Sequence, residues 1–222
     1  PIGLVLLQPD LGTAMVLSVI VIGMLSVAGT QGRFLVAMAL VAIIGVVGIL
    51  QLGVLKSYQV DRLTVFLNQS ETNASSNAQG SAYNLDQSKT AIGNGGFLGE
   101  GLFKGRQTEL SYVPEQHTDF IFTAIGEQLG FVGSVTVLAL FGIITWRMWR
   151  ISRAAPDVTG MLISIGVASM FVFHIFENVG MTMGIMPITG IPLPFVSYGG
   201  SSIMLMFMSV GLVSNVYMHR YD

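Results

Sequence analysis

The sequence predicts an all-α integral membrane protein, a polytopic helical bundle with one large loop outside the membrane and re-entrant segments. Of the 222 residues, 52% are hydrophobic and only 10% are charged, whereas an ordinary soluble domain carries roughly 25% charged residues. The charges are also segregated, because long uncharged apolar runs alternate with polar stretches. Strands of a membrane barrel would alternate in segments of about ten residues, but these runs are continuous. This excludes a soluble domain, a disordered chain and a basic nucleic-acid-binding domain, and the lack of Cys excludes disulfides and thiolate metal sites.

Four or five stretches are long enough to cross a membrane, since a bilayer core needs about 20 apolar residues in a helix. The expected spans cover residues 11–30, 33–55, 119–148, 158–183 and 201–218. A polar segment, residues 56–118, separates the second and third of them and is too long for a turn. We expect it to form the large loop, with a flexible tip at residues 70–81, which are rich in Asn, Ser, Gln and Gly.

The basic residues of the short connections predict the orientation in the membrane. They are Arg33 in one turn, Arg147, Arg150 and Arg153 in another, and Arg220 near the C-terminus. All of them fall on one side if the spans alternate, and the positive-inside rule makes that side cytoplasmic. We therefore expect a multi-pass protein of the bacterial inner membrane with a cytoplasmic C-terminus and an extracytoplasmic loop 56–118. Trp146 and Trp149 suit the membrane interface beside the Arg cluster.

A Gln8-Pro9-Asp10 motif interrupts the apolar residues near the start of the chain. The Asp10 carboxylate can accept hydrogen bonds from the free N–H groups of the next helix, so an ordinary helix cap explains it. The alternative is a broken helix whose carboxylate lines a cavity. Because the chain begins with Pro1 and shows no signal-peptide pattern, we expect it to begin partway through a longer protein.

A glycine-rich segment, residues 91–105, contains Lys104 and is followed by Arg106. Glycine lets a backbone approach a ligand, and consecutive amide groups can bind phosphate. The Gly-Lys-Ser/Thr ending of a P-loop is absent, however, and a lone glycine-rich loop is weak evidence. Tight packing of a re-entrant loop is the favoured interpretation.

Two acids and a His gather just before the third expected span, as Glu115, His117 and Asp119. Thr123 and Glu127 follow Asp119 at four and eight residues, which predicts one shared helical face. A carboxylate inside a span costs around 2.5–3.5 kcal/mol, which favours a position facing a cavity. Asp119 is a candidate general base, although a helix cap is the simpler alternative. His117 is more simply a hydrogen-bonded interfacial residue than a metal ligand.

His174, Glu177 and Asn178 occupy one face of the fourth expected span. Polar side chains in spans commonly join helices by hydrogen bonds, so a structural role is favoured. Three prolines between residues 187 and 194 then forbid a helix. The turn that follows opens the last span with free N–H groups near Ser201, a place suited to an anion.

Taken together and in order, these motifs resemble the SEDS family (shape, elongation, division and sporulation), which includes RodA, FtsW and SpoVE. The matching stretches are Gln8–Ala14, Tyr58–Gln59 with Arg62, Gln87–Gly105, Pro114–Phe122 with Gly126–Gly133, and Asn178–Ser202. Residues 185–192 and 105–108 resemble the RodA branch more than the FtsW branch. Departures from the family pattern occur at Gln69, Ala82 and Asn84, all within the expected loop.

The resemblance implies that the chain is the C-terminal half of a ten-helix membrane fold with both termini in the cytoplasm. It implies a peptidoglycan glycosyltransferase that polymerises lipid II into glycan strands during cell elongation and shape maintenance. The implied partners are a class B penicillin-binding protein, which is the transpeptidase, and the elongation machinery. The family's essential acid corresponds to Asp119, and Asp10 is expected to line the same cavity.

A single inverting displacement would then transfer the glycan from its polyprenyl pyrophosphate carrier. Asp119 would be the base, while further residues would bind substrate: Asp10, Arg62, Gln87, Lys89, Lys104, Arg106, Glu115, His117 and Ser201. No organic cofactor is expected, but a divalent cation, Mg or Mn, could share the pyrophosphate charge. Two alternatives remain, a lipid II flippase or other transporter, and a non-catalytic membrane scaffold that recruits the penicillin-binding protein.

Overall fold

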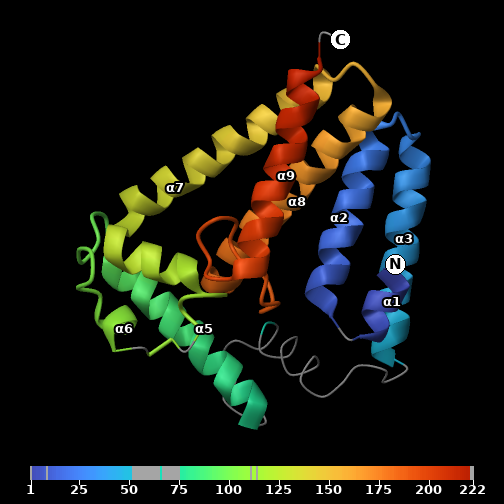
Figure 1. Ribbon diagram of the computed structural model, residues 1–222. Helices are drawn as coiled ribbons and strands as arrows, with labels where there is room; N and C mark the ends of the chain where they lie inside the picture. The colour runs from blue at the N-terminus through green and yellow to red at the C-terminus, as the bar shows by residue number, and fades with distance from the viewer. Residues whose placement is uncertain are drawn as a thin grey trace. The chain divides into compact units, whose positions relative to one another are not determined.

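The computed structural model describes residues 2–8, 10–51, 66, 76–110, 112–113 and 115–220. These residues form helices and irregular segments, with no strand among them, which confirms the predicted all-α fold class (Figure 1). The helices are α1 (Ile2–Leu7), α2 (Leu11–Val27), α3 (Gly32–Gln51), α5 (Ser76–Gly95), α6 (Arg106–Glu109), α7 (Ile121–Arg153), α8 (Val158–Met183) and α9 (Gly200–Met218).

Three helices, α7, α8 and α9, are long and apolar enough to cross a membrane, while α2 and the described part of α3 are shorter apolar helices. The bounds of α8 coincide with the expected span. Helix α2 ends at Val27, earlier than expected, because Gly29 adopts a φ of +81° that ends the helix. Helix α7 begins two residues later than expected and continues to Arg153, since Arg is a good helix former.

The chain divides into two compact units. The first unit contains Pro1–Val60, Thr145–Phe173 and Phe207–Asp222. Within it, α2 packs closely against α8, because a Cβ atom placed on Gly23 would lie only 2.0 Å from the hydroxyl oxygen of Ser169. A small residue at this position lets the two apolar helices approach each other.

The second unit contains Asp61–Ile144 and His174–Met206. Its core includes Phe122 and Phe141 of α7 together with Leu193 of the segment between α8 and α9. That irregular segment, residues 184–199, is here named the α8–α9 segment. It folds into the unit, and Leu193 and Ser197 are almost fully buried. The proline-rich sequence therefore forms part of the core rather than a loop on the surface.

The expected large loop contains helical structure. Helix α5 buries Leu85, Ser88 and Ala91, which lie three residues apart on one face. The prediction of a flexible tip at residues 70–81 is wrong for residues 76–81, which belong to α5. Residues 70–75 lie outside the described residues. Packing of one side of a largely polar helix decides this structure, and composition alone does not reveal it.

Candidate functional site

Asp119 lies in a turn of residues 115–120 and precedes α7, which begins at Ile121. The predicted helical face shared with Thr123 and Glu127 therefore needs correction, because only the latter two are inside the helix. Asp119 is half-buried. The α8–α9 segment approaches its carboxylate so closely that a Cβ atom on Gly190 would lie 3.1 Å from Asp119 Oδ2. Gly190 also has a φ of +77°, so both the space and the backbone favour glycine.

The backbone of residues 117–119 is held by hydrogen bonds at three consecutive carbonyl oxygens. The carbonyl of residue 117 accepts from the N–H of Tyr198 at 2.8 Å. The carbonyl of Thr118 accepts from the Ser197 hydroxyl at 2.6 Å, and the carbonyl of Asp119 accepts from Asn178 Nδ2 at 2.8 Å. Because every carbonyl is fixed from outside the turn, the position of the Asp119 backbone is set before any substrate binds.

The polar face of α8 holds the α8–α9 segment in place. His174 Nδ1 lies 3.1 Å from the carbonyl oxygen of Pro192, and Asn178 Nδ2 donates to the carbonyl of Ile191 at 2.8 Å. The Thr189 hydroxyl donates to Glu177 Oε1 at 2.9 Å. These bonds support the structural interpretation of the three polar residues on α8. They also connect α8 to the Gly190 backbone that borders the Asp119 carboxylate.

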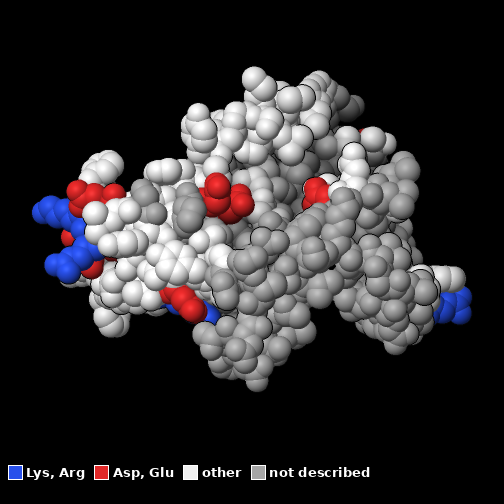
Figure 2. Space-filling model, turned by 90° about the horizontal axis from the view of Figure 1, so that it is seen from below, with Lys and Arg blue, Asp and Glu red and all other residues white. Residues whose placement is uncertain are grey.

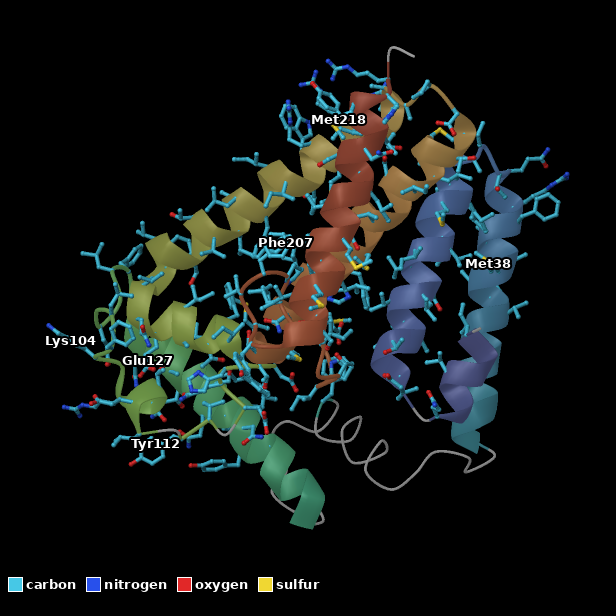
Figure 3. All side chains as sticks on the ribbon, in the orientation of Figure 1. Met38, Lys104, Tyr112, Glu127, Phe207 and Met218 are labelled. Atoms are coloured by element: carbon cyan, nitrogen blue, oxygen red, sulfur yellow. The ribbon has the colours of Figure 1, made fainter. Side chains whose placement is uncertain are left out.

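Glu127 performs a role that the sequence did not reveal. Its carboxylate is fully buried and accepts hydrogen bonds from the backbone N–H groups of Gln107 at 2.8 Å and Thr108 at 2.9 Å. The Thr108 hydroxyl donates to the same carboxylate. Glu127 thus satisfies the free N–H groups of α6 from a neighbouring helix, and Figure 3 shows it beside that helix. A Cβ atom on Gly105 would lie 2.6 Å from Glu127 Oε2, which explains the glycine.

The glycine-rich segment packs against a kink in α7. The kink is at Gly130, where φ is +65° and ψ is −163°. Beyond it, the N–H groups of Phe131 and Val132 donate to the carbonyl oxygens of Gly96 and Phe97 at 2.9 and 3.1 Å. The segment therefore pairs with helical N–H groups that the kink frees.

Amide groups of the same segment also donate to α7. The N–H groups of Glu100 and Gly101 bond to the carbonyl oxygens of Glu127 and Gln128, at 3.0 and 3.1 Å. An amide group that already donates to a helix carbonyl is not available to a phosphate group. The packing interpretation of the glycines agrees with this arrangement.

The basic residues beside this segment are exposed. Lys104 points outward from its loop (Figure 3). Arg106 opens α6, and its backbone N–H donates to Glu100 Oε2 at 3.3 Å. Figure 2 shows basic and acidic side chains interleaved at the end of the second unit that carries α6. The structure thus places these two cations on a mixed, solvated surface.

The remaining candidates of the second unit surround the Asp119 turn or lie on α5 and α9. Glu115 is exposed and accepts a hydrogen bond from the Thr118 hydroxyl at 2.9 Å. The His117 side chain is exposed, and Ser201 is exposed in the first turn of α9. Gln87 and Lys89 are half-buried on α5. Their roles in binding substrate stay predictions.

Asp10 belongs to the first unit, where it caps α2. Its carboxylate accepts from the Thr13 N–H at 3.0 Å and from the Thr13 hydroxyl at 2.6 Å. The cap interpretation is therefore correct, and a cavity shared with Asp119 stays a prediction. Arg62 lies outside the described residues. The same holds for Pro9, Tyr58, Gln59 and Pro114 of the matching motifs and for Gln69, which departs from the family pattern.

The whole chain, residues 1–222, matches a protein family described as cell cycle proteins, whose model is named for FtsW, RodA and SpoVE. The chain belongs to the FtsW, RodA and SpoVE family. This confirms the resemblance to the SEDS family that the motifs predicted. Membership, together with three helices long and apolar enough to span, makes the chain part of a multi-pass membrane protein.

Curated relatives carry several names within the family. Stage V sporulation protein E of Bacillus subtilis is 40% identical over 96% of this chain and 56% of its own length. The "probable peptidoglycan glycosyltransferase FtsW" of Trichlorobacter lovleyi is 40% identical over 97% of this chain and 54% of its own. The peptidoglycan glycosyltransferase MrdB of Escherichia coli is 36% identical over 99% of this chain and 58% of its own length. The chain thus spans little more than half of these relatives, and the identities do not separate the branches.

Solved structures of the family share the fold. A chain from a study of how a peptidoglycan synthase complex coordinates polymerization and crosslinking has a TM-score of 0.78 and 31% identity. The match covers all of this chain and 59% of that one. The rod shape determining protein RodA of Thermus thermophilus has a TM-score of 0.63 and 30% identity, over all of this chain and 54% of its own.

Proposed function

We propose that this chain supplies the catalytic base, Asp119, of a peptidoglycan glycosyltransferase that polymerises lipid II into glycan strands. The observation that carries the proposal is the Asp119 turn, where a half-buried carboxylate stands on a backbone fixed at three consecutive carbonyls. Relatives named peptidoglycan glycosyltransferase support the reaction class. A rigidly positioned carboxylate at a helix start suits a proton-transfer role.

In the proposed step, a sugar hydroxyl of one substrate attacks the anomeric carbon of the other. The new C–O bond forms as the bond to the polyprenyl pyrophosphate breaks, which inverts the configuration from α to β. The Asp119 carboxylate accepts the hydroxyl proton, and the electron pair of the broken bond leaves with the pyrophosphate. Asp119 must therefore be ionised before the step and within hydrogen-bond reach of the attacking hydroxyl.

Lys89 is the described cation that we place nearest the leaving group. Leu85 of α5 packs against Ile188, two residues before the glycine that borders the Asp119 carboxylate. Lys89 follows Leu85 by one helical turn and lies on the same side of α5. Arg62 remains a second candidate, and the exposed Lys104 and Arg106 suit the approach of an anionic substrate better than contact with the reacting atoms.

The proposed divalent cation, Mg or Mn, would rely mainly on the substrate. Within the described part of the chain, no three His, Cys, Asp or Glu residues are grouped so as to hold a metal ion. Mg²⁺ is commonly bound through one or two carboxylates plus substrate phosphates. The pyrophosphate oxygens of the substrate would thus provide most of the ligands of the cation. No organic cofactor enters the proposal.

The test is polymerisation of purified lipid II by the full-length protein in detergent, with wild type compared to Asp119→Asn. General base catalysis typically contributes 10²–10⁴-fold, so we expect the variant to lose at least about a hundredfold in rate. Glu109→Gln, an exposed acid on α6, is the matched control and should keep the wild-type rate. A variant Asp119→Asn that polymerises normally would refute the assignment.

The same assay separates the alternatives. A flippase needs two membrane faces, so glycan polymer formed in detergent favours the enzyme. A scaffold would form no polymer at all. We further propose the inner-membrane orientation predicted above, a class B penicillin-binding protein as partner, and a role in elongation. A solved chain of similar fold comes from a complex described as coordinating polymerization and crosslinking, which supports the partner proposal.

A further inference from the structure

The first unit contains a pocket where the C-terminal ends of two membrane-spanning helices meet. The pocket is partly open, has a volume of about 390 Å³, and is lined by Arg147, Arg150, Ile151 and Ala154 of α7 and by Tyr217 and Arg220 at the end of α9. Figure 1 shows these two helix ends near the C-terminus of the chain. Three guanidinium groups thus line one pocket, and none of the lining residues that the structure describes is acidic.

Aromatic rings hold two of the three pocket arginines, Arg150 and Arg220, in defined positions. The guanidinium carbon of Arg150 lies 5.1 Å from the centre of the Trp146 ring, and that of Arg220 lies 3.7 Å from the Tyr217 ring. Arg153 lies over Trp149 at 5.0 Å in an adjoining groove of about 420 Å³. A guanidinium group stacked on a ring keeps its N–H donors in its own plane, where they can bind phosphate oxygens in pairs.

The positive-inside rule explains why arginines lie on this side of the membrane, but it does not require a pocket. Arg33 shows the difference, because it is an exposed residue in the first turn of α3 that stacks on Phe34 and does not line the pocket. The three pocket arginines instead surround a volume large enough for a small anionic group. Such a cluster of guanidinium groups recognises phosphate.

We propose that this pocket binds the phosphodiester headgroup of an anionic phospholipid. The position favours a lipid over a free phosphate, since α7 and α9 are both apolar enough to span the membrane and the pocket lies at their ends. Trp146 and Trp149 are 50% and 42% exposed, as expected for side chains at the headgroup level. On α9, Leu212 and Met208 are 54% and 69% exposed and provide an apolar surface for acyl chains.

Quenching of tryptophan fluorescence by brominated lipids tests the proposal, because the only two Trp residues of the sequence, Trp146 and Trp149, flank the pocket. The full-length protein is placed in mixed micelles with brominated phosphatidylglycerol or brominated phosphatidylcholine. A Trp146→Phe, Trp149→Phe variant measures the background from any other tryptophan. We expect tighter, saturable quenching by the anionic lipid.

Charge removal then locates the site. Each arginine near an anionic lipid contributes about fivefold in affinity, so Arg147→Gln with Arg150→Gln should weaken binding about 25-fold. The matched control Arg33→Gln loses a charge outside the pocket and should bind like wild type. Arg147→Lys with Arg150→Lys keeps the charge but loses paired N–H contacts, so it should lose part of the selectivity between the two lipids.

Three results would overturn the proposal. One is equal quenching by the two lipids in the wild type. Another is an equal loss in the control and the pocket variant, which would indicate general attraction to a charged surface. The third is full displacement of the lipid by soluble glycerol phosphate at the same concentration, which would make the ligand a free phosphate. Thermal unfolding of each variant in detergent establishes that it is folded before binding is measured.

Discussion

Replacement of Gly190 by Ala should reduce activity by moving the Asp119 carboxylate. The new Cβ atom would lie 3.1 Å from Asp119 Oδ2 and 3.7 Å from its carboxyl carbon. The first distance is shorter than ordinary van der Waals contact, so the carboxylate or the segment must shift by a few tenths of an ångström. The φ of +77° adds a backbone cost of about 1–2 kcal/mol for a non-glycine residue.

The shift and the strain predict different effects. Misplacement of a reacting group by 1 Å can cost about 10²-fold in rate, so a shift of a few tenths should lower kcat by roughly three- to tenfold. KM should change little, because the substrate-binding surface is otherwise intact. The strain should lower the free energy of unfolding by about 1–2 kcal/mol. Lipid II polymerisation gives the first quantity, and thermal unfolding in detergent the second.

Gly29→Ala is the matched control for this prediction. Gly29 has a φ of +81°, almost the same strain, but a Cβ atom there would meet nothing within 4 Å. We therefore expect a similar loss of stability without a loss of kcat. Equal kcat values for the two folded variants would show that contact with Asp119 has no consequence for the reaction, and would refute the reasoning.

Two further predictions concern stability within the second unit. Glu127→Gln should lower the free energy of unfolding by about 2–3 kcal/mol, because hydrogen bonds to a charged acceptor are worth about 1.5–3 kcal/mol and the amide turns donors toward the α6 N–H groups. Thermal unfolding measures this against the exposed control Glu109→Gln. A decrease in melting temperature no larger than that of the control would contradict the prediction. Asn178→Ala should cost about 2–4 kcal/mol and lower kcat, since the carbonyls of Asp119 and Ile191 both lose their donor; unchanged thermal unfolding would exclude it.

Helix α8 was predictable because its signals are local. An apolar run without proline lies between Asp157, whose carboxylate accepts from the Gly160 N–H at 3.2 Å, and Gly184, whose φ is +76°. Both ends carry residues that typically begin and end helices. The predicted bounds therefore agree with the structure.

Helix α5 and the role of Glu127 were not predictable in this way. The α5 sequence is mostly polar, and its helix depends on burial of a few side chains against distant parts of the chain, such as Ser88 against Thr123 at 2.6 Å. The partners of Glu127 lie 19 and 20 residues away in an irregular segment. No periodic pattern in the sequence predicts that such residues contact each other. Asp119, by contrast, became a candidate through its motif, and its catalytic role stays a prediction. The start of the helix that follows it was expected two residues too early.

The hydrogen bonds at residues 117–119 hold the backbone of the candidate site, here called its frame, and they do not involve the side chains of these three residues. Every acceptor is a backbone oxygen, which exists whatever side chain the position carries, while the donors belong to other segments. Exchanges at His117 and Thr118 therefore leave the frame intact, whereas exchanges at Ser197 and Asn178 remove donors. In a saturation mutagenesis experiment scored by thermal unfolding, His117 and Thr118 should tolerate exchange, and the intolerant positions should lie about 60 to 80 residues further along the chain.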